Sequence, residues 1–169
     1  MTPGDFTEKY YPFAKETQDK TGISAIVILA QAALESGWGE HAPGNAFFGV
    51  KDTDGVNGNE QLITTTEISR RSDLQFPVII SMVPTTINGQ KYFKYTVKDY
   101  FRKYDTPEEC FTDHTNFFLK NERYAQALAV KSDPDKFADA IATAGYATAP
   151  GYAILLKKII SMISLHKPY

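Results

Sequence analysis

The stretch from Ser24 to Gly39 constrains the fold of this chain more than any other part of the sequence. It is apolar on every side for almost three helical turns, which predicts a helix buried all round rather than a surface helix. Ser24 is a suitable N-cap, and Gly37 and Gly39 are suited to end the helix. A fold that contains this segment must therefore place apolar neighbours around most of it.

A single carboxylate, Glu35, stands at the end of this apolar run. Burial disfavours the charged form of a carboxylate and raises its pKa, and the C-terminal end of a helix dipole acts in the same direction. A carboxyl that keeps its proton near neutral pH can serve as a general acid. We therefore consider Glu35 a candidate general acid; the alternative is a glutamate at the helix end that turns to solvent.

The composition restricts the class of protein. A chain of 169 residues predicts one domain with enough apolar residues for a core. The net charge of −2 provides no basic field to attract nucleic acid. The single cysteine, Cys110, excludes an internal disulfide framework. No stretch is long and apolar enough to span a membrane, and the first residues lack the basic and apolar regions of a secretory signal.

The first hundred residues change character twice. Residues 5–20 have the spacing of an amphipathic helix, either kinked at Pro12 or with its regular part beginning there. Residues 37–59 are rich in Gly, Asn and Asp and predict a loop, where a substrate groove is expected. Residues 60–100 predict an antiparallel β lobe inserted in a helical protein, with Asn88-Gly89 as a hairpin turn. The expected strands are Leu62–Ile68, Phe76–Val83 and Tyr92–Val97.

Helical patterns return after the β-rich region. Thr106, Pro107 and Glu109 have the spacing of a capping box with proline at the first helical position. The helices expected after this one are Asn121 to Val130, a helix capped by Asp133 and ended by Gly145, and a last helix from near Pro150.

Six short stretches, taken in order, resemble a known family. They are Leu29–Gly39, Asn45–Lys51, Thr65–Glu67, Phe101–Glu109, Asn121–Ala125 and Ala144–Thr148. The chain is similar to the glucosaminidase domain of flagellar rod-type peptidoglycan hydrolases and autolysins, glycoside hydrolase family seventy-three. The resemblance extends over most of residues 20–160, and six motifs in the same order are much more specific than one.

The resemblance implies a mainly helical α+β fold: a lysozyme-like helical domain with a small antiparallel β lobe flanking a groove. Residues 1–169 then form one domain, with the lobe at about residues 60–100. The implied activity is hydrolysis of the glycan of bacterial peptidoglycan as an endo-β-N-acetylglucosaminidase, with no cofactor and no metal. The implied catalytic residues are Glu35, as general acid, and Glu67, as second carboxylate. The implied substrate-binding residues are Trp38, Asn45, Phe48, Tyr124 and Tyr146.

The sequence departs from the family pattern in three places. Ala149 replaces an aspartate expected to cap the last helix, which should cost about 0.5–2 kcal/mol unless Thr148 takes over the capping. Ala46 replaces an asparagine, which removes one polar contact expected in the groove. The segment from Glu67 to Phe101 is longer than expected, so the β lobe is enlarged and the position of Glu67 is less securely assigned than that of Glu35.

Several alternatives stay open at this point. Glu67 could activate a water, act as a nucleophile, or be dispensable because the 2-acetamido group of the substrate attacks instead. Glu60 and Asp52 are weaker candidates for the second carboxylate. The runner-up activity is that of an N-acetylmuramidase on the same polymer, and a non-catalytic cell-wall-binding module is a third possibility.

Rival chemistries find less support in the sequence. His41, His114 and His166 are scattered and form no metal-binding motif, although Cys110 and His114 are one helical turn apart. Cys110 follows two acidic residues, which do not favour a thiolate nucleophile. We expect a monomer that binds peptidoglycan glycan strands at the bacterial cell wall. Without a visible signal, export would use lysis, as in an endolysin, a dedicated secretion system, as for an effector, or processing of a longer precursor.

Overall fold

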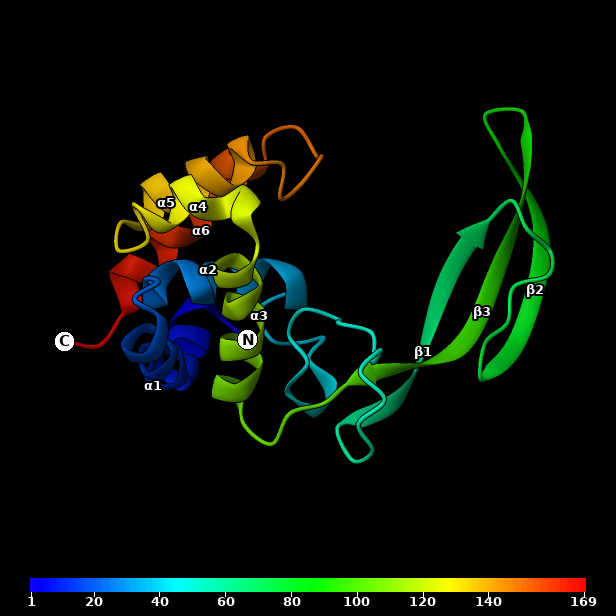
Figure 1. The fold of residues 1–169 in the computed structure, drawn as a ribbon, viewed down its shortest axis with the longest axis horizontal. Helices are drawn as coiled ribbons and strands as arrows, with labels where there is room; N and C mark the ends of the chain where they lie inside the picture. The colour runs from blue at the N-terminus through cyan, green and yellow to red at the C-terminus, as the bar shows by residue number, and fades with distance from the viewer. The chain divides into compact units, whose positions relative to one another are not determined.

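The computed structural model describes residues 1–169, which divide into two compact units (Figure 1). The helical unit comprises residues 1–48 and 104–169, and the β unit comprises residues 49–103. The helices are α1 (Pro3–Thr21), α2 (Ala25–Ser36), α3 (Pro107–Lys120), α4 (Ala125–Leu128), α5 (Pro134–Thr143) and α6 (Tyr152–His166), with short 3-10 helices at Pro43–Asn45 and Glu122–Tyr124. The strands are β1 (Glu60–Ser69), β2 (Val78–Ile87) and β3 (Gln90–Arg102).

Helix α2 is the central element of the helical unit, as the sequence predicts. Nine of its twelve residues are buried, and it packs against α1, α3, α5 and α6. The hydroxyl of Ser24 accepts a hydrogen bond from the backbone N–H of Ile26 and caps the helix. Gly37 ends it in the left-handed conformation with φ of +59°, which a residue without a Cβ adopts at little cost.

Helix α1 is longer than the sequence predicts. It begins at Pro3, where Thr2 and Asp5 form a reciprocal capping box, and it runs without interruption to Thr21. Pro12 lies inside the helix, so the expectation that the regular part begins there is wrong. The helix packs on α2, α3 and α6 with its buried face.

The caps of the later helices differ in detail from the predicted ones. Thr106 accepts a hydrogen bond from Glu109 N–H at 3.2 Å, but the Glu109 carboxylate bonds Asp105 N–H rather than the cap residue itself. The α5 cap is Asp133, as predicted. Helix α6 has Gly151 at its N-cap with no side-chain hydrogen bond, so Thr148 does not take over the role of the missing aspartate.

The stretch from residue 121 to residue 130 is divided in the structure. We expected one short helix there, but a 3-10 turn at Glu122–Tyr124 precedes the single turn of α4. Asn121 caps the 3-10 turn by accepting a hydrogen bond from Arg123 N–H at 3.2 Å.

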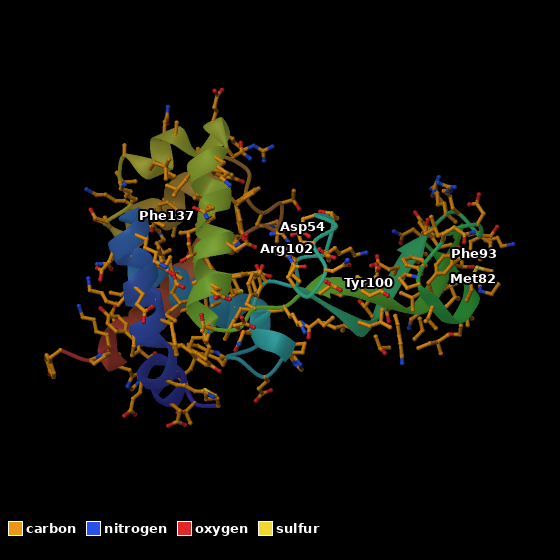
Figure 2. All side chains as sticks on the ribbon, turned by 60° about the horizontal axis from the view of Figure 1, so that its bottom comes forward. Asp54, Met82, Phe93, Tyr100, Arg102 and Phe137 are labelled. Atoms are coloured by element: carbon orange, nitrogen blue, oxygen red, sulfur yellow. The ribbon has the colours of Figure 1, made fainter.

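The β unit is one three-stranded antiparallel sheet with the order β1-β3-β2. Asn88 and Gly89 form the two-residue turn between β2 and β3 with φ of +49° and +75°, as the sequence predicts. Figure 2 shows Met82 of β2 and Phe93 of β3 on this hairpin. It also shows Arg102 near Asp54, and their ion pair of 3.6 Å connects the end of β3 to the loop that precedes β1.

The predicted fold class is therefore confirmed: the chain is mainly helical with a small antiparallel sheet inserted between helical segments. The β unit extends beyond the predicted lobe because it includes the loop from residue 49 and a bridge between Lys51 and Phe101. None of the helices combines the length and the apolar character that a membrane span requires.

Candidate active site

Glu35 lies in the last turn of α2, two residues before the glycine that ends the helix. Its side chain is exposed, which agrees with the alternative of a glutamate at the helix end that turns to solvent. Partial burial of the carboxyl nevertheless raises the pKa of Glu35, in the direction that the sequence predicts. Desolvation is the cause of this shift in pKa.

Two tyrosines are close enough to Glu35 to be affected by its charge. Burial is the main reason why the pKa values of Tyr146 and Tyr152 are raised, that of Tyr152 to about 12, and the Glu35 charge contributes to both. Both phenols therefore keep their protons at neutral pH. Tyr152 also accepts a hydrogen bond from Gln31 Nε2 at 3.2 Å, and Gln31 lies one helical turn before Glu35.

Gln31 and Tyr152 were not among the residues that the sequence predicts for the site. The signal for Gln31 is its isolation, because it is the one polar side chain within the apolar part of α2. It is 2% exposed and bonds Tyr152, which itself is 9% exposed. Each of these two residues therefore provides the hydrogen-bond partner that the other, as a buried polar group, needs.

Tyr146, Phe48 and His114 form an aromatic group in the helical unit. The His114 ring stacks on the Phe48 ring with 3.7 Å between centroids and 10° between planes. Its Nε2 atom lies 3.4 Å from the Tyr146 hydroxyl oxygen. The structure thus brings together two of the predicted substrate-binding residues, Phe48 and Tyr146, and adds His114 between them.

Tyr124 occupies a different environment from Tyr146. It is 1% exposed, and its ring packs against Phe117 and Phe118 with centroid separations of 5.5 Å and 5.1 Å. A ring buried in this way offers no face to a sugar in this structure, and a role for Tyr124 in binding or positioning the substrate stays a prediction. Its ring instead forms part of the aromatic core on which Tyr146 rests.

Trp38 and Asn45 make structural contacts within the helical unit. Trp38 packs edge-on against Phe6 with 5.5 Å between ring centroids and an interplanar angle of 89°. Asn45 donates a hydrogen bond from Nδ2 to the Tyr104 carbonyl at 3.0 Å. Both residues have positive φ, at +57° and +59°, so each occupies a conformation that few non-glycine residues adopt. A role in substrate binding remains a prediction for both.

Glu67 lies on β1 and is held by a lysine of its own unit. The Lys51 ammonium lies 2.8 Å from Glu67 Oε1 and 3.1 Å from Asp99 Oδ2, and the Glu67 side chain is 34% exposed. The hydrogen bond with Glu67 is the largest cause of a raised pKa for Lys51, which therefore stays cationic. The two weaker candidates for the second carboxylate have other surroundings than Glu67. Glu60 accepts a hydrogen bond from Gly58 N–H at 2.8 Å, and burial raises the pKa of Asp52.

With the fold and the position of Glu35 described, comparison of the sequence with known families identifies the class of protein. A family model described as glucosaminidase, mannosyl-glycoprotein endo-beta-N-acetylglucosaminidase, matches residues 11–165. The chain therefore belongs to this family of glycoside hydrolases, and the predicted resemblance and enzyme class are confirmed.

Two curated proteins show which members of the family this chain is similar to. The peptidoglycan hydrolase FlgJ of Salmonella typhimurium is 34% identical over 166 residues, covering 94% of this chain and 45% of the relative. A probable N-acetylmuramidase of Lactococcus lactis is 30% identical over 170 residues, covering 95% of this chain and 33% of the relative. The chain thus spans less than half the length of these curated relatives.

A solved structure extends the likeness to three dimensions. The glycoside hydrolase domain of Salmonella typhimurium FlgJ matches with a TM-score of 0.73 and 30% identity, covering 98% of this chain and 90% of that domain. The expectation of a lysozyme-like glycoside hydrolase fold is therefore confirmed.

Proposed function

We propose that this chain hydrolyses the glycan of bacterial peptidoglycan as an endo-β-N-acetylglucosaminidase. Membership of the glucosaminidase family and the likeness to FlgJ support the substrate and the bond class. The single observation that carries the catalytic assignment is the raised pKa of the Glu35 carboxyl beside Tyr146 and Tyr152. No cofactor and no metal take part in this proposal.

Glu35 is the general acid in this reaction. Cleavage of a glycosidic bond requires a proton on the leaving oxygen and stabilisation of positive charge at the anomeric carbon. A carboxyl with a raised pKa retains its proton to higher pH and can deliver it as the bond breaks. The side chain is exposed, so a polymeric substrate can reach it without prior opening of the fold.

Glu67 is the proposed second carboxylate. Its ion pair with Lys51 at 2.8 Å supports a role as an anion that activates water, acts as a nucleophile or stabilises positive charge. Attack by the substrate acetamido group would leave Glu67 a smaller role, so the effect of Glu67→Gln on rate separates these mechanisms. Trp38, Asn45, Phe48 and Tyr146 are the proposed substrate-binding residues; Tyr124 is not retained as a direct contact.

Product analysis tests the bond that is cut. Purified peptidoglycan is digested, reduced with sodium borohydride and hydrolysed, and the reduced sugar is identified. New reducing ends at N-acetylglucosamine are expected. The matched control pair is Glu35→Gln, which should release reducing ends about 10³-fold more slowly, and Glu16→Gln, a substitution of an exposed glutamate of α1 that should behave as wild type.

The second candidate function is that of an N-acetylmuramidase, which the relative from Lactococcus lactis favours. Reduced N-acetylmuramic acid in the same assay would establish it and refute our choice. Binding to peptidoglycan without release of any reducing end would instead indicate a wall-binding module. We propose the cell wall as the place of action and a monomer as the acting species, with gel filtration as the measurement for the latter.

A further inference from the structure

His114 is a partly buried titratable group that the proposed function does not use. It lies on α3 and contacts residues from two other segments of the helical unit. Its ring stacks on Phe48 at 3.7 Å and meets Phe118 edge-on at 5.4 Å with an interplanar angle of 86°. These contacts on the face and the edge of the ring hold its plane in one orientation.

The protonation states of His114 and Tyr146 limit the hydrogen bonds that the pair can form. Desolvation lowers the pKa of His114 to about 4, although neighbouring Asp113 acts in the opposite direction, so the imidazole is neutral at pH 7. Burial raises the pKa of Tyr146, so the phenol keeps its proton. With Nε2 at 3.4 Å from the phenol oxygen, a neutral imidazole allows two arrangements: Tyr146 O–H donates to an unprotonated Nε2, or Nε2–H donates to the phenol oxygen. In the first arrangement, Nδ1 carries the ring proton.

The first arrangement affects which groups the phenol oxygen of Tyr146 can bind. In the arrangement with an unprotonated Nε2, the only hydrogen of the phenol is directed toward His114, and the oxygen lone pairs remain available as acceptors. The oxygen also lies within the influence of the Glu35 charge. An acceptor there suits an N–H or O–H group of a sugar, such as the N–H of a 2-acetamido group next to the bond that Glu35 would protonate.

We propose that His114 is a positioning residue that fixes the Tyr146 hydroxyl as a hydrogen-bond acceptor for the acetamido sugar bound beside Glu35. This inference rests on the proposed function for its substrate, but the hydrogen bond itself does not. His114 then acts through Tyr146 and touches no reacting atom. Its contribution must disappear once the Tyr146 hydroxyl is removed.

A double-mutant cycle tests this coupling. His114→Phe keeps an aromatic ring against Phe48 and removes the acceptor, while Tyr146→Phe removes the donor. Each single variant should lower kcat/KM on solubilised peptidoglycan strands by about tenfold, as expected for one lost hydrogen bond, and the double variant should be no slower than the slower single variant. Independent losses that multiply to about a hundredfold would overturn the proposal.

A conservative variant separates positioning from packing. In His114→Gln the amide oxygen can take the place of Nε2, so this variant should recover most of the rate that His114→Phe loses, although it loses the ring. A purely structural role for the ring predicts the opposite order. Thermal unfolding of each variant shows whether the fold is retained, and only variants with a wild-type transition enter the comparison.

A measurement without activity keeps this inference separate from the proposed function. The nitrogen chemical shifts of His114 at pH 7 should identify an unprotonated Nε2, and that resonance should move in Tyr146→Phe. A protonated Nε2, or a resonance that Tyr146→Phe leaves in place, would refute the positioning role even in an active enzyme. The expected shifts together with no release of reducing ends would uphold the hydrogen bond and refute only the proposed function.

Discussion

The helical unit and the β unit each present one candidate carboxylate, and the two differ in what surrounds them. Glu35 ends a helix in which nine of twelve residues are buried, and desolvation alone raises its pKa. Glu67 lies on a strand whose residues alternate between partly buried and exposed, and it pairs with Lys51 at 2.8 Å. The same type of side chain is thus partly desolvated without a cation in one unit and paired with an ammonium in the other.

The difference teaches that environment, and not residue type, assigns the two proposed roles. A carboxyl without a cation beside it loses the stabilisation of its charged form when apolar groups exclude water. A carboxylate with an ammonium at hydrogen-bonding distance keeps that stabilisation even when half of its water is gone. Exchanging or removing these surroundings is the most direct way to test the assignment.

The largest effect is expected from removing the acid itself. Glu35→Gln keeps the size and polarity of the side chain but has no proton to deliver. We expect kcat on purified peptidoglycan to fall about 10³-fold, within the range of general acid catalysis. The rate of appearance of reducing ends measures it, with Glu16→Gln as control. A variant with more than a tenth of wild-type kcat would remove Glu35 as the acid.

An intermediate effect is expected from the ion pair in the β unit. Glu67→Gln should lower kcat by about 10²-fold if the anion takes part, and Lys51→Met should lower it by about tenfold because Lys51 acts by holding Glu67. Combining the two substitutions should cost no more than Glu67→Gln alone. A Lys51→Met enzyme at full rate, together with an inactive Glu67→Gln enzyme, would show that the lysine has no share in the role of Glu67.

The smallest effect concerns stability as a function of pH. Because the pKa of Glu35 is higher in the folded state, the folded state binds more protons, and this residue contributes less stability as pH rises from the unfolded pKa through the folded pKa. Glu35→Gln should therefore be more stable than wild type at pH 7, by less than about 1 kcal/mol because the side chain is exposed. Urea unfolding at pH 4 and pH 7 measures the difference.

Glu67→Gln in the β unit is the control for the stability of Glu35→Gln, and no gain in stability is expected from it. Glu67→Gln breaks an ion pair and should be equally stable or slightly less stable than wild type at pH 7. A gain in stability for Glu67→Gln and a loss for Glu35→Gln would invert the comparison between the two units.

Local patterns in the sequence were sufficient for most of the elements. The apolar run that became α2, the Ser24 cap, the Asn88-Gly89 turn and the Asp133 cap all depend on interactions between residues close in the chain. The prediction for residues 121–130 was wrong because a 3-10 turn and an α-helical turn have nearly the same spacing of apolar residues over so short a stretch.

Site residues were harder to predict because their partners are distant in the chain. His114 looked like one of three scattered histidines, and nothing near it in the sequence indicates that Tyr146 lies 3.4 Å from its Nε2 atom. Tyr124 and Tyr146 belong to similar motifs, yet one is buried and the other is partly open. Exposure is a property of packing, so no local pattern separates them.

The sequence by itself determined that one carboxylate would end an apolar helix, because both the helix and its glycine stop are local features. It also determined the insertion of a β hairpin and a third strand between helical segments. Only the tertiary structure decided the raised pKa of Glu35 and the ion pair of Glu67, since these depend on which distant groups remove water or supply charge. Neither the exposure of Glu35 nor the distance of 2.8 Å between Lys51 Nζ and Glu67 Oε1 can be predicted from any single stretch of the sequence.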